Sequence, residues 1–386
     1  MNDIRRTILW VIFGFSMVLL WDQWQIHTGH KATFFPRAEP VAAAKAAAAS
    51  ATVPTASTAP AGPGQVPVAA QTAAAHELID VETDLYKLRF DTEGGSLVHS
   101  EFRKLPDMQD HAKSFVLFDE SKERVYLAQT GLIGGQLPTH KSPMRFVGER
   151  QLKEGQNELT LRFESEAVNG VKLVKTYTLQ RGSYAIGVKH EVVNQSAAPV
   201  SPQLYMQLVR DGNKPAGESS FYSTFTGPAI YTEAKKYHKV EFKDIENNKA
   251  EIDKQSSNGY VAMVQHYFAS AWLLGEGVER ENFVRKVDNN LYAVGMITPL
   301  GEVAPGQSKA LENKLFVGPQ EEKKLEALAP GLELLKDYGW LAMLAKPLYW
   351  LLDQLYKFIN NWGWSIMALV LLLKIAFYWL NAKAYA

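Results

Sequence analysis

The sequence predicts a mostly β protein in which a large antiparallel sandwich lies between two transmembrane helices. Apolar runs lie near both ends of the 386-residue chain, at 7–24 and 362–383, and roughly 20 mostly apolar residues can cross a bilayer as a helix. Between the runs, apolar and polar residues alternate with period two and turn signals recur, as in antiparallel sheets with one solvated face. We therefore expect the sandwich at 76–325, followed by C-terminal α-helices.

The N-terminal apolar run is expected to be an uncleaved signal anchor. Arg5 and Arg6 precede it, and basic residues stay on the cytoplasmic side of a membrane. The sequence after it, Asp-Gln-Trp-Gln-Ile-His, offers no small-x-small cleavage site, which disfavours the alternative of a cleaved signal peptide. Residues 1–6 are then cytoplasmic, 7–24 form the anchor, and the chain that follows is exported.

The segment at 25–75 is expected to be a disordered linker. From Ala38 to Ala75 its composition falls to mainly Ala, Pro, Thr, Ser and Gly. Such a stretch has no apolar periodicity with which to offset the entropy of ordering.

Alternation identifies individual strands within the exported domain. In "NELTLRFES", Leu159, Leu161 and Phe163 alternate with polar side chains. In "YAIGVKHEVVN", every second residue from Ile186 to Val192 belongs to one face, which includes His190. Glycine-containing turn signals such as "EGGS", "QRGS" and "APGQS" separate such runs.

Beyond Gly318 the periodicity becomes helical. "PQEEKKLEALA" has Pro319 near a first-turn position and acidic residues behind it, and Pro330 with Gly331 should end that helix. The linker helix and a second, amphipathic helix occupy 326–361. We expect the second helix to lie in the membrane interface, although packing on the sandwich is the alternative. Its expected apolar face comprises Leu341, Leu344, Leu348, Leu351, Leu355 and Phe358.

The second apolar run carries a cation, Lys374, far from either end. If the first span leads out, the second runs back in, so Lys374 lies about 18 Å below the exported surface, in the cytoplasmic half of the bilayer. A charge there costs at least about 2.5–3.5 kcal/mol unless it faces protein or water. Lys374 either snorkels to the surface near Lys383 or faces a polar cavity that opens to the cytoplasm.

Composition and motifs exclude several other functions. The chain has 41 basic and 41 acidic residues without a basic block, so nucleic-acid binding is not expected. It has no cysteine, and its one close histidine pair, His27 and His30, makes no metal site. Phosphate-binding loops, nucleophile elbows and paired catalytic carboxylates do not occur in the sequence. We expect no cofactor, no metal and no enzymatic activity.

Taken together and in this order, nine stretches resemble the YidC family of bacterial membrane protein insertases. They are "RRTILWVIFGFSMVLLWDQW", "DTEGGSL", "TGLIG", "EGQNELTL", "QRGSYAIGV", "GYVAMVQHYFASAW", "LFVGP", "DYGWL" and "NWGWSIMALVLLLK". The resemblance implies a periplasmic β-supersandwich of galactose-mutarotase-like fold, without known catalysis. It also implies five membrane helices around an amphiphilic groove, in the bacterial inner membrane.

The resemblance also implies a role for Lys374, which matches the groove cation that meets polar parts of an incoming client. The usual family residue there is arginine, and lysine keeps the charge without the planar fork. The implied partners are nascent integral membrane proteins, the lipid bilayer and the Sec translocon (SecYEG and SecDF). The chain ends at Ala386, so we expect it to lack the remaining core helices and to be inactive alone.

Two functions remain open on this basis. The first is a membrane protein insertase and chaperone. The alternative is a membrane-anchored periplasmic sandwich that binds or modifies carbohydrate. Lys374 discriminates between them, because a mere anchor gains nothing from a cation within its span.

Overall fold

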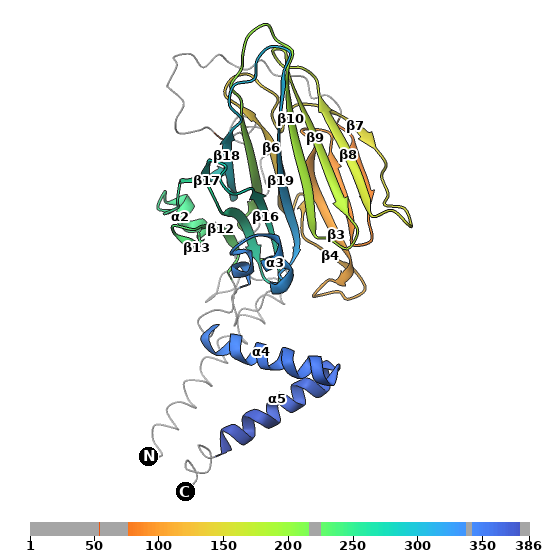
Figure 1. The fold of residues 1–386 in the computed structure, drawn as a ribbon, viewed down its shortest axis with the longest axis vertical. Coiled ribbons are helices and arrows are strands. Elements are labelled where there is room, and N and C mark those ends of the chain that lie inside the picture. The colour runs from red at the N-terminus through yellow and green to blue at the C-terminus, as the bar shows by residue number, and fades with distance from the viewer. Residues whose placement is uncertain (1–53, 55–75, 216–224, 337–341, 379–386) are drawn as a thin grey trace, which may run out of the picture. The chain divides into compact units, whose positions relative to one another are not determined.

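The computed structural model describes residue 54 and residues 76–215, 225–336 and 342–378. Arg5, Arg6, the predicted anchor at 7–24 and almost all of the predicted linker at 25–75 lie outside these residues. The described residues form a two-sheet β-sandwich with short helices, and a separate pair of C-terminal helices (Figure 1).

Two large antiparallel sheets make up the sandwich. The ten-stranded sheet contains, in spatial order, β1 (Leu78–Glu82), β2 (Tyr86–Asp91), β3 (Ser96–Pro106), β6 (Val125–Ile133), β11 (Gln203–Asp211), β18 (Leu291–Pro299), β17 (Arg280–Asp288) and β14 (Gln255–Ser256), with β4 (Ser114–Val116) on β3 and β5 (Asp119–Glu120) on β6. The nine-stranded sheet contains β13 (Lys236–Lys239), β12 (Gly227–Thr232), β15 (Tyr260–Gln265), β16 (Phe268–Leu274), β19 (Ser308–Pro319), β10 (Ala185–Asn194), β9 (Val171–Gln180), β8 (Glu158–Ser165) and β7 (Met144–Gly148).

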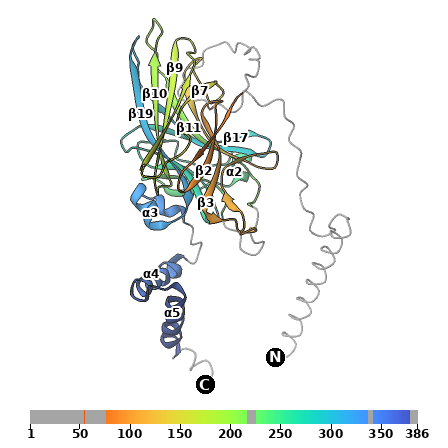
Figure 2. The same cartoon turned by 90° about the vertical axis from the view of Figure 1, so that its right-hand side faces the viewer.

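The chain crosses between the two sheets several times. It passes from β6 to β7, returns between β10 and β11, and crosses again through α2 (Phe242–Glu246), which joins β13 to β14. Figure 2 shows β19, β10 and β9 of one sheet beside β11, β17 and β2 of the other. The prediction of a large antiparallel sandwich is confirmed.

The main core lies between the sheets, and the predicted alternation places side chains in it. Leu159, Leu161 and Phe163 of β8 are buried, while the intervening residues are exposed or half-buried. On β10 the same holds for the face from Ile186 to Val192, which includes the fully buried His190. These strands follow the prediction because only one of their faces is covered.

A second core covers the outer face of the nine-stranded sheet. Helix α3 (Glu322–Leu328) and the 3₁₀ helix η1 (Leu332–Leu335) bury Leu325, Leu332 and Leu335 there. In both views α3 lies beside the end of β19 (Figure 1, Figure 2). The predicted domain boundary after residue 325 therefore falls inside α3, whose apolar side packs on the sandwich.

The position predicted for Pro319 was wrong. Pro319 is the last residue of β19, where it pairs with Phe268 of β16, and the helix begins only at Glu322. Strand pairing extends to Pro319 because a proline at a strand end needs no N–H for the ladder.

The predicted helix break at Pro330 and Gly331 is confirmed, and Gly331 has a packing role as well. Its φ of 76° lies in the left-handed region, and a Cβ there would approach the ring of Tyr231 to 2.5 Å. The Tyr260 hydroxyl donates a hydrogen bond of 2.8 Å to the Gly331 carbonyl oxygen. The rings of Tyr231 and Tyr260 stack with centroids 5.4 Å apart. Only glycine allows this close approach of η1 to the sheet.

The C-terminal helices are α4 (Ala342–Ile359) and α5 (Trp362–Ala376). Asn360, with a φ of 54°, reverses the chain between them, and the Asn361 side chain caps α5 by accepting a hydrogen bond from the Trp364 N–H. Of the helices within the described ranges, none combines the length and the hydropathy needed to cross a membrane. Helix α5 has 15 described residues, and the last part of the predicted span, 379–383, lies outside the description.

Candidate functional site

Lys374 lies in the last turn of α5 with an exposed side chain. The residues one turn before it are apolar and also exposed, with Val370 at 47% and Leu371 at 60%. No ion pair or hydrogen bond joins Lys374 to another described side chain. The structure thus places the predicted groove cation on an apolar helix surface.

The predicted apolar face of α4 is only partly described. Leu348, Leu351 and Leu355 are half-buried along one side of the helix, whereas Phe358 is 92% exposed. Leu341 lies outside the described residues, and the side chain of Leu344 is not described either. Trp350, at 62% exposure, adds a second large exposed aromatic to α4.

Polar contacts connect α4 to the helical segment on the sandwich. The Asp353 carboxylate pairs with Lys323 of α3 at 3.0 Å and with Lys357 at 3.2 Å. The hydrogen bond from Lys323 is the main reason that the pKa of Asp353 is lowered. The Lys336 ammonium lies 4.3 Å from the centroid of the Tyr349 ring. The two lysine partners of Asp353 are exposed to solvent, so each ion pair contributes little to stability.

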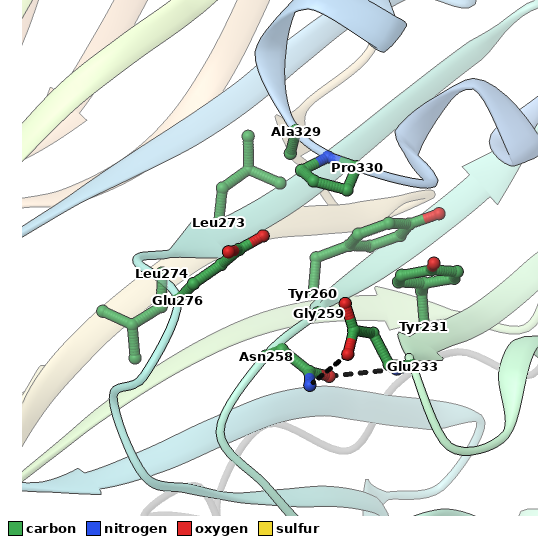
Figure 3. A pocket seen from close by; sticks show the side chains of 10 residues that line it. All are labelled: Tyr231, Glu233, Asn258, Gly259, Tyr260, Leu273, Leu274, Glu276, Ala329 and Pro330. Carbon is green, nitrogen blue, oxygen red and sulfur yellow. Dashed lines mark hydrogen bonds between the residues drawn. The ribbon is translucent and has the colours of Figure 1, made fainter.

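One cavity lies where the α3–η1 connection meets the nine-stranded sheet (Figure 3). Figure 3 shows Pro330 close to the ring of Tyr260, and Asn258 hydrogen bonded to Glu233. The cavity has a volume of about 30 Å³, which is enough for about one water molecule. It is too small for a sugar ring.

A larger, polar cavity, which we call the end cavity, opens where the β1–β2 and β9–β10 turns meet. Its volume is about 300 Å³. It is lined by Glu82, Thr83, Asp84, Arg103, Gln151, Leu152, Glu154 and Arg181. With one apolar lining residue, it does not resemble the mostly apolar pockets that bind small-molecule substrates.

Lys175 of β9 is buried between the sheets and connects them. Its ammonium donates to the carbonyl oxygens of Thr130, at 2.7 Å, and of Gly94. His190 contacts the Thr130 hydroxyl at 2.9 Å, and Asn313 donates to the other His190 ring nitrogen at 3.2 Å. Burial lowers the pKa of Lys175 to about 7 and that of His190 well below its usual value. This cluster is closed off from solvent between the two sheets.

His140 forms a second buried polar contact, with Tyr205. The His140 backbone N–H donates to the Tyr205 hydroxyl at 3.0 Å, and that hydroxyl lies 2.5 Å from Nδ1 of the same histidine. Burial, with the nearby charges of Lys141, Lys175 and Arg285, lowers the pKa of His140 to about 3. The ring is therefore neutral at neutral pH, and its buried Nε2 has no hydrogen-bond partner among the described residues.

Arg280 organises the loops at the start of β15 and the end of β16. Its guanidinium donates to the carbonyl oxygens of Gly259 at 2.9 Å and Ser257 at 3.2 Å, and also to those of Val278, Leu274 and Gly275. Burial lowers its pKa to about 10, so the group remains a cation at neutral pH. Here a buried charge is compensated by the dipoles of five carbonyl groups, and nearby Glu276 also favours the charged form.

The sequence analysis missed these buried cations. Lys175 carried a usable signal, because in "VKLVKTYTLQ" it occupies the same alternation register as Leu173 and Tyr177, which are buried. Arg280 carried none, because its carbonyl partners come from loops whose path alternation does not predict.

Comparison with protein families shows that the model of the YidC periplasmic domain matches residues 78–351. Three relatives, each named membrane protein insertase YidC, align with 99% of this chain. The protein from Cupriavidus necator is 49% identical over 390 residues, and the alignment covers 70% of its length. The protein from Janthinobacterium sp. strain Marseille is 47% identical, with 69% covered. The protein from Burkholderia multivorans is 46% identical, with 70% covered.

Solved structures with a similar chain path are much more distant. A galactose mutarotase-like protein from Lactobacillus casei is 11% identical, with a TM-score of 0.39 over 62% of this chain and all of the other. The α-galactosidase AgaB from Geobacillus stearothermophilus is 11% identical, with a TM-score of 0.35 over 64% of this chain and 40% of the other. At these scores the likeness has no bearing on function.

Proposed function

This chain belongs to the YidC family of membrane protein insertases, and we propose that it assists the insertion and folding of nascent integral membrane proteins in a bacterial inner membrane. The observation that carries this proposal is the identity of 46–49% with insertases over 99% of the chain. The folded sandwich is then the periplasmic domain. We propose the Sec translocon (SecYEG and SecDF) as a partner and a multi-pass topology, on the basis of the sequence.

In the proposed topology, Arg5 and Arg6 hold the N-terminus in the cytoplasm and residues 7–24 form the first span. The sandwich lies in the periplasm, and 362–383 form a second span that returns to the cytoplasm. The exposed apolar surface of α5, which includes Met367 at 61% and Ile375 at 64%, supports this placement. Such a surface is costly in water and favourable in lipid.

We further propose that α4 lies in the periplasmic membrane interface. Trp350 and Phe358 expose large aromatic surfaces, and Trp362 and Trp364 follow at the start of α5. Aromatic residues of this kind concentrate where the headgroups meet the acyl chains.

Lys374 is the proposed contact for polar parts of a client. In a low-dielectric groove a single cation attracts carboxylates far more strongly than in water. It also lowers the cost of bringing an acidic client tail into the bilayer. An exported sandwich that binds or modifies carbohydrate is not favoured by the comparisons, because the relatives at high coverage are named as insertases.

The test is charge reversal at Lys374 in a full-length context, expressed in cells depleted of their own insertase. Lys374→Glu should slow insertion of clients with acidic exported tails by about tenfold, or about 1.4 kcal/mol. Lys374→Arg should keep insertion near normal, because the charge remains. Pulse-labelling with protease accessibility of a client measures both.

Lys357→Glu is the matched control, because it reverses an exposed lysine of α4 that pairs with Asp353. It should leave client insertion nearly unchanged. Normal insertion by Lys374→Glu would contradict the groove-cation role, and failure of all variants to restore growth would contradict the insertase function.

A further inference from the structure

The two-residue turn between β15 and β16 has an unusual composition for a tight hairpin. His266 and Tyr267 form the turn, and Gln265 pairs with Phe268 at its base. Tyr267 has a φ of 66°, in the left-handed region, yet its side chain is 59% exposed. Asparagine or glycine is preferred in such turns, and a left-handed conformation costs other residues about 1–2 kcal/mol. Folding alone does not account for a tyrosine here.

The turn is held rigidly in this strained conformation. The backbone N–H of Gln320 donates to the Tyr267 carbonyl oxygen at 2.8 Å. The Gln320 side-chain amide donates to the carbonyl oxygens of Gln265 and Phe268, both at 3.0 Å. Phe268 also stacks on Phe115 with centroids 3.8 Å apart. Strain that its surroundings enforce in this way is a common feature of functional positions.

The turn lies at the end of the sandwich from which the chain continues towards α4. Gln320, which holds the turn, is followed by α3 at Glu322, and Lys323 of α3 pairs with Asp353 of α4. The length of the connecting chain limits the distance between this end of the sandwich and the start of α4. Residues 337–341 join Lys336 to α4 and can span at most about 20 Å.

The end cavity lies at this same end. The Asp84 carboxylate, which lines it, accepts a hydrogen bond of 3.1 Å from the N–H of Gly182. Two residues later, the Tyr184 carbonyl oxygen accepts from the N–H of Val317 at 3.0 Å, close to where β19 ends. Two guanidinium groups and three carboxylates line the cavity of about 300 Å³. Arg181 donates to the carbonyl oxygens of Gln156 and Lys153, and Arg103 lies 3.9 Å from Glu82. A small group that carries both a phosphate and an ammonium would replace this loose Arg103–Glu82 pair.

We propose that this end of the sandwich, defined by His266, Tyr267 and the end cavity, contacts the phospholipid headgroup layer of the bilayer. The Tyr267 ring lies at the interface, where an amphipathic aromatic is favoured. A zwitterionic headgroup occupies the end cavity, with its phosphate at Arg103 and its ammonium at the carboxylates. The inference rests on the proposed membrane location of α4 and α5.

The absence of cysteine from the chain allows a direct test with single labels. His266→Cys carries a fluorophore beside the Tyr267 ring, in the full chain reconstituted into vesicles of phosphatidylethanolamine and phosphatidylglycerol. Lipids with a nitroxide on the headgroup should quench this label at least threefold more than a label at Ser308→Cys. Ser308 is exposed at the opposite end of β19, about 40 Å along the strand. Equal quenching at both sites would overturn the proposal.

Tyr267→Asn separates a membrane role from a folding role. Asparagine tolerates the left-handed conformation, so the variant should melt at a higher temperature, yet it should lose at least half of the quenching at position 266. Tyr267→Trp should retain the quenching. A lower melting temperature with unchanged quenching for Tyr267→Asn would show that the tyrosine serves folding only, and would overturn the proposal.

The end cavity is tested by headgroup choice. The quenching should weaken about twofold in vesicles of phosphatidylglycerol alone, and Arg103→Gln should abolish that difference between vesicles. Soluble phosphoethanolamine should not reduce the quenching, because the bilayer holds its own headgroups at the cavity at a much higher local concentration. Effective competition, or no dependence on headgroup, would overturn this part. Quenching needs no client, so it can fail while insertion and its dependence on Lys374 persist, which distinguishes this inference from the proposed function.

Discussion

The sandwich buries its large apolar side chains, whereas helix α5 exposes most of its own. Between the sheets, large side chains such as Trp272, Phe163 and Tyr126 are essentially inaccessible to solvent. On α5, Ser365 is the one buried residue of the described helix, while Ile366 and Leu371 are more than half exposed. The sandwich is thus stabilised by its own core in water, whereas the surface of α5 suits an apolar surrounding.

The same two regions differ in how they accommodate cations. Arg280 and Lys175 are buried, and backbone carbonyl oxygens compensate for the loss of water around them. Lys374 is exposed on an apolar helix. In the sandwich the cations are held by backbone carbonyl oxygens, whereas on α5 the ammonium of Lys374 lies on an exposed apolar surface.

The largest expected effect separates the two regions by their tryptophans. Trp272→Ala removes a side chain that is 1% exposed and whose indole N–H donates to the Gln207 carbonyl oxygen at 3.1 Å. It should lower the free energy of unfolding of the sandwich by about 3–5 kcal/mol. A denaturant titration of the full chain in mild detergent measures this free energy, with hydrogen exchange of the strands as the readout.

Trp350→Ala is the matched control, because this side chain is 62% exposed on α4. It should change the stability of the sandwich by less than about 0.5 kcal/mol. Similar losses from both substitutions would break the comparison, since they would show that α4 and the sandwich unfold as one unit.

An intermediate effect concerns pH and the buried histidine His140. Its pKa falls from 6.5 in the unfolded chain to about 3 in the fold. Between these values the unfolded chain binds a proton that the folded chain does not, so stability rises with pH across this window and is lost on acidification below 6.5. One such proton changes the free energy of unfolding by about 1.4 kcal/mol per pH unit.

His140→Asn removes this titration and retains an acceptor for the Tyr205 hydroxyl. Denaturant titrations between pH 4.5 and 6.5 should show a stability change about 2 kcal/mol smaller than in the unaltered chain. Part of the pH dependence that remains in this variant comes from His190, because burial also lowers the pKa of that histidine. An unaltered slope in His140→Asn would refute the buried, neutral state of this ring.

The smallest expected effect concerns the junction between the regions. Gly331→Ala introduces a Cβ that meets the Tyr231 ring at 2.5 Å, in addition to left-handed strain. Gly277→Ala carries similar strain at a φ of 79° but meets nothing within 4 Å. Gly331→Ala should therefore cost about 1–2 kcal/mol more than Gly277→Ala. Faster hydrogen exchange confined to α3 and η1 would locate the loss, and equal costs would mean that η1 adjusts freely.

Alternation predicted the strands that have one covered face, such as β8 and β10, and failed to describe those covered on both. Residues 260–265 and 268–274, in β15 and β16, are buried throughout. Period two disappears there because α3 and η1 cover the outer face. The turn at His266 and Tyr267 was equally hidden, since neither residue is a turn former and Gln320, distant in sequence, holds it in place.

For the candidate site, the sequence identified Lys374 as a cation in an apolar helix, because charge within an apolar run is a local property. What Lys374 faces depends on residues packed around α5 and stays a prediction. The end cavity could not be predicted at all, because Asp84, Arg103 and Arg181 come from three separate turns and strand ends that only the fold brings together.

The sandwich, the helical C-terminal segment and the break at Gly331 could be predicted from the sequence, because periodicity, turn residues and backbone preference are local properties. The extension of β19 to Pro319, the packing of α3 and η1 on the sandwich and the burial of Arg280 follow from contacts between distant parts of the chain. Those outcomes depend on which distant carbonyl groups and apolar faces meet. The pattern of apolar and polar residues along the chain shows which face of a strand or helix can be buried, but it does not show which distant segment will cover that face.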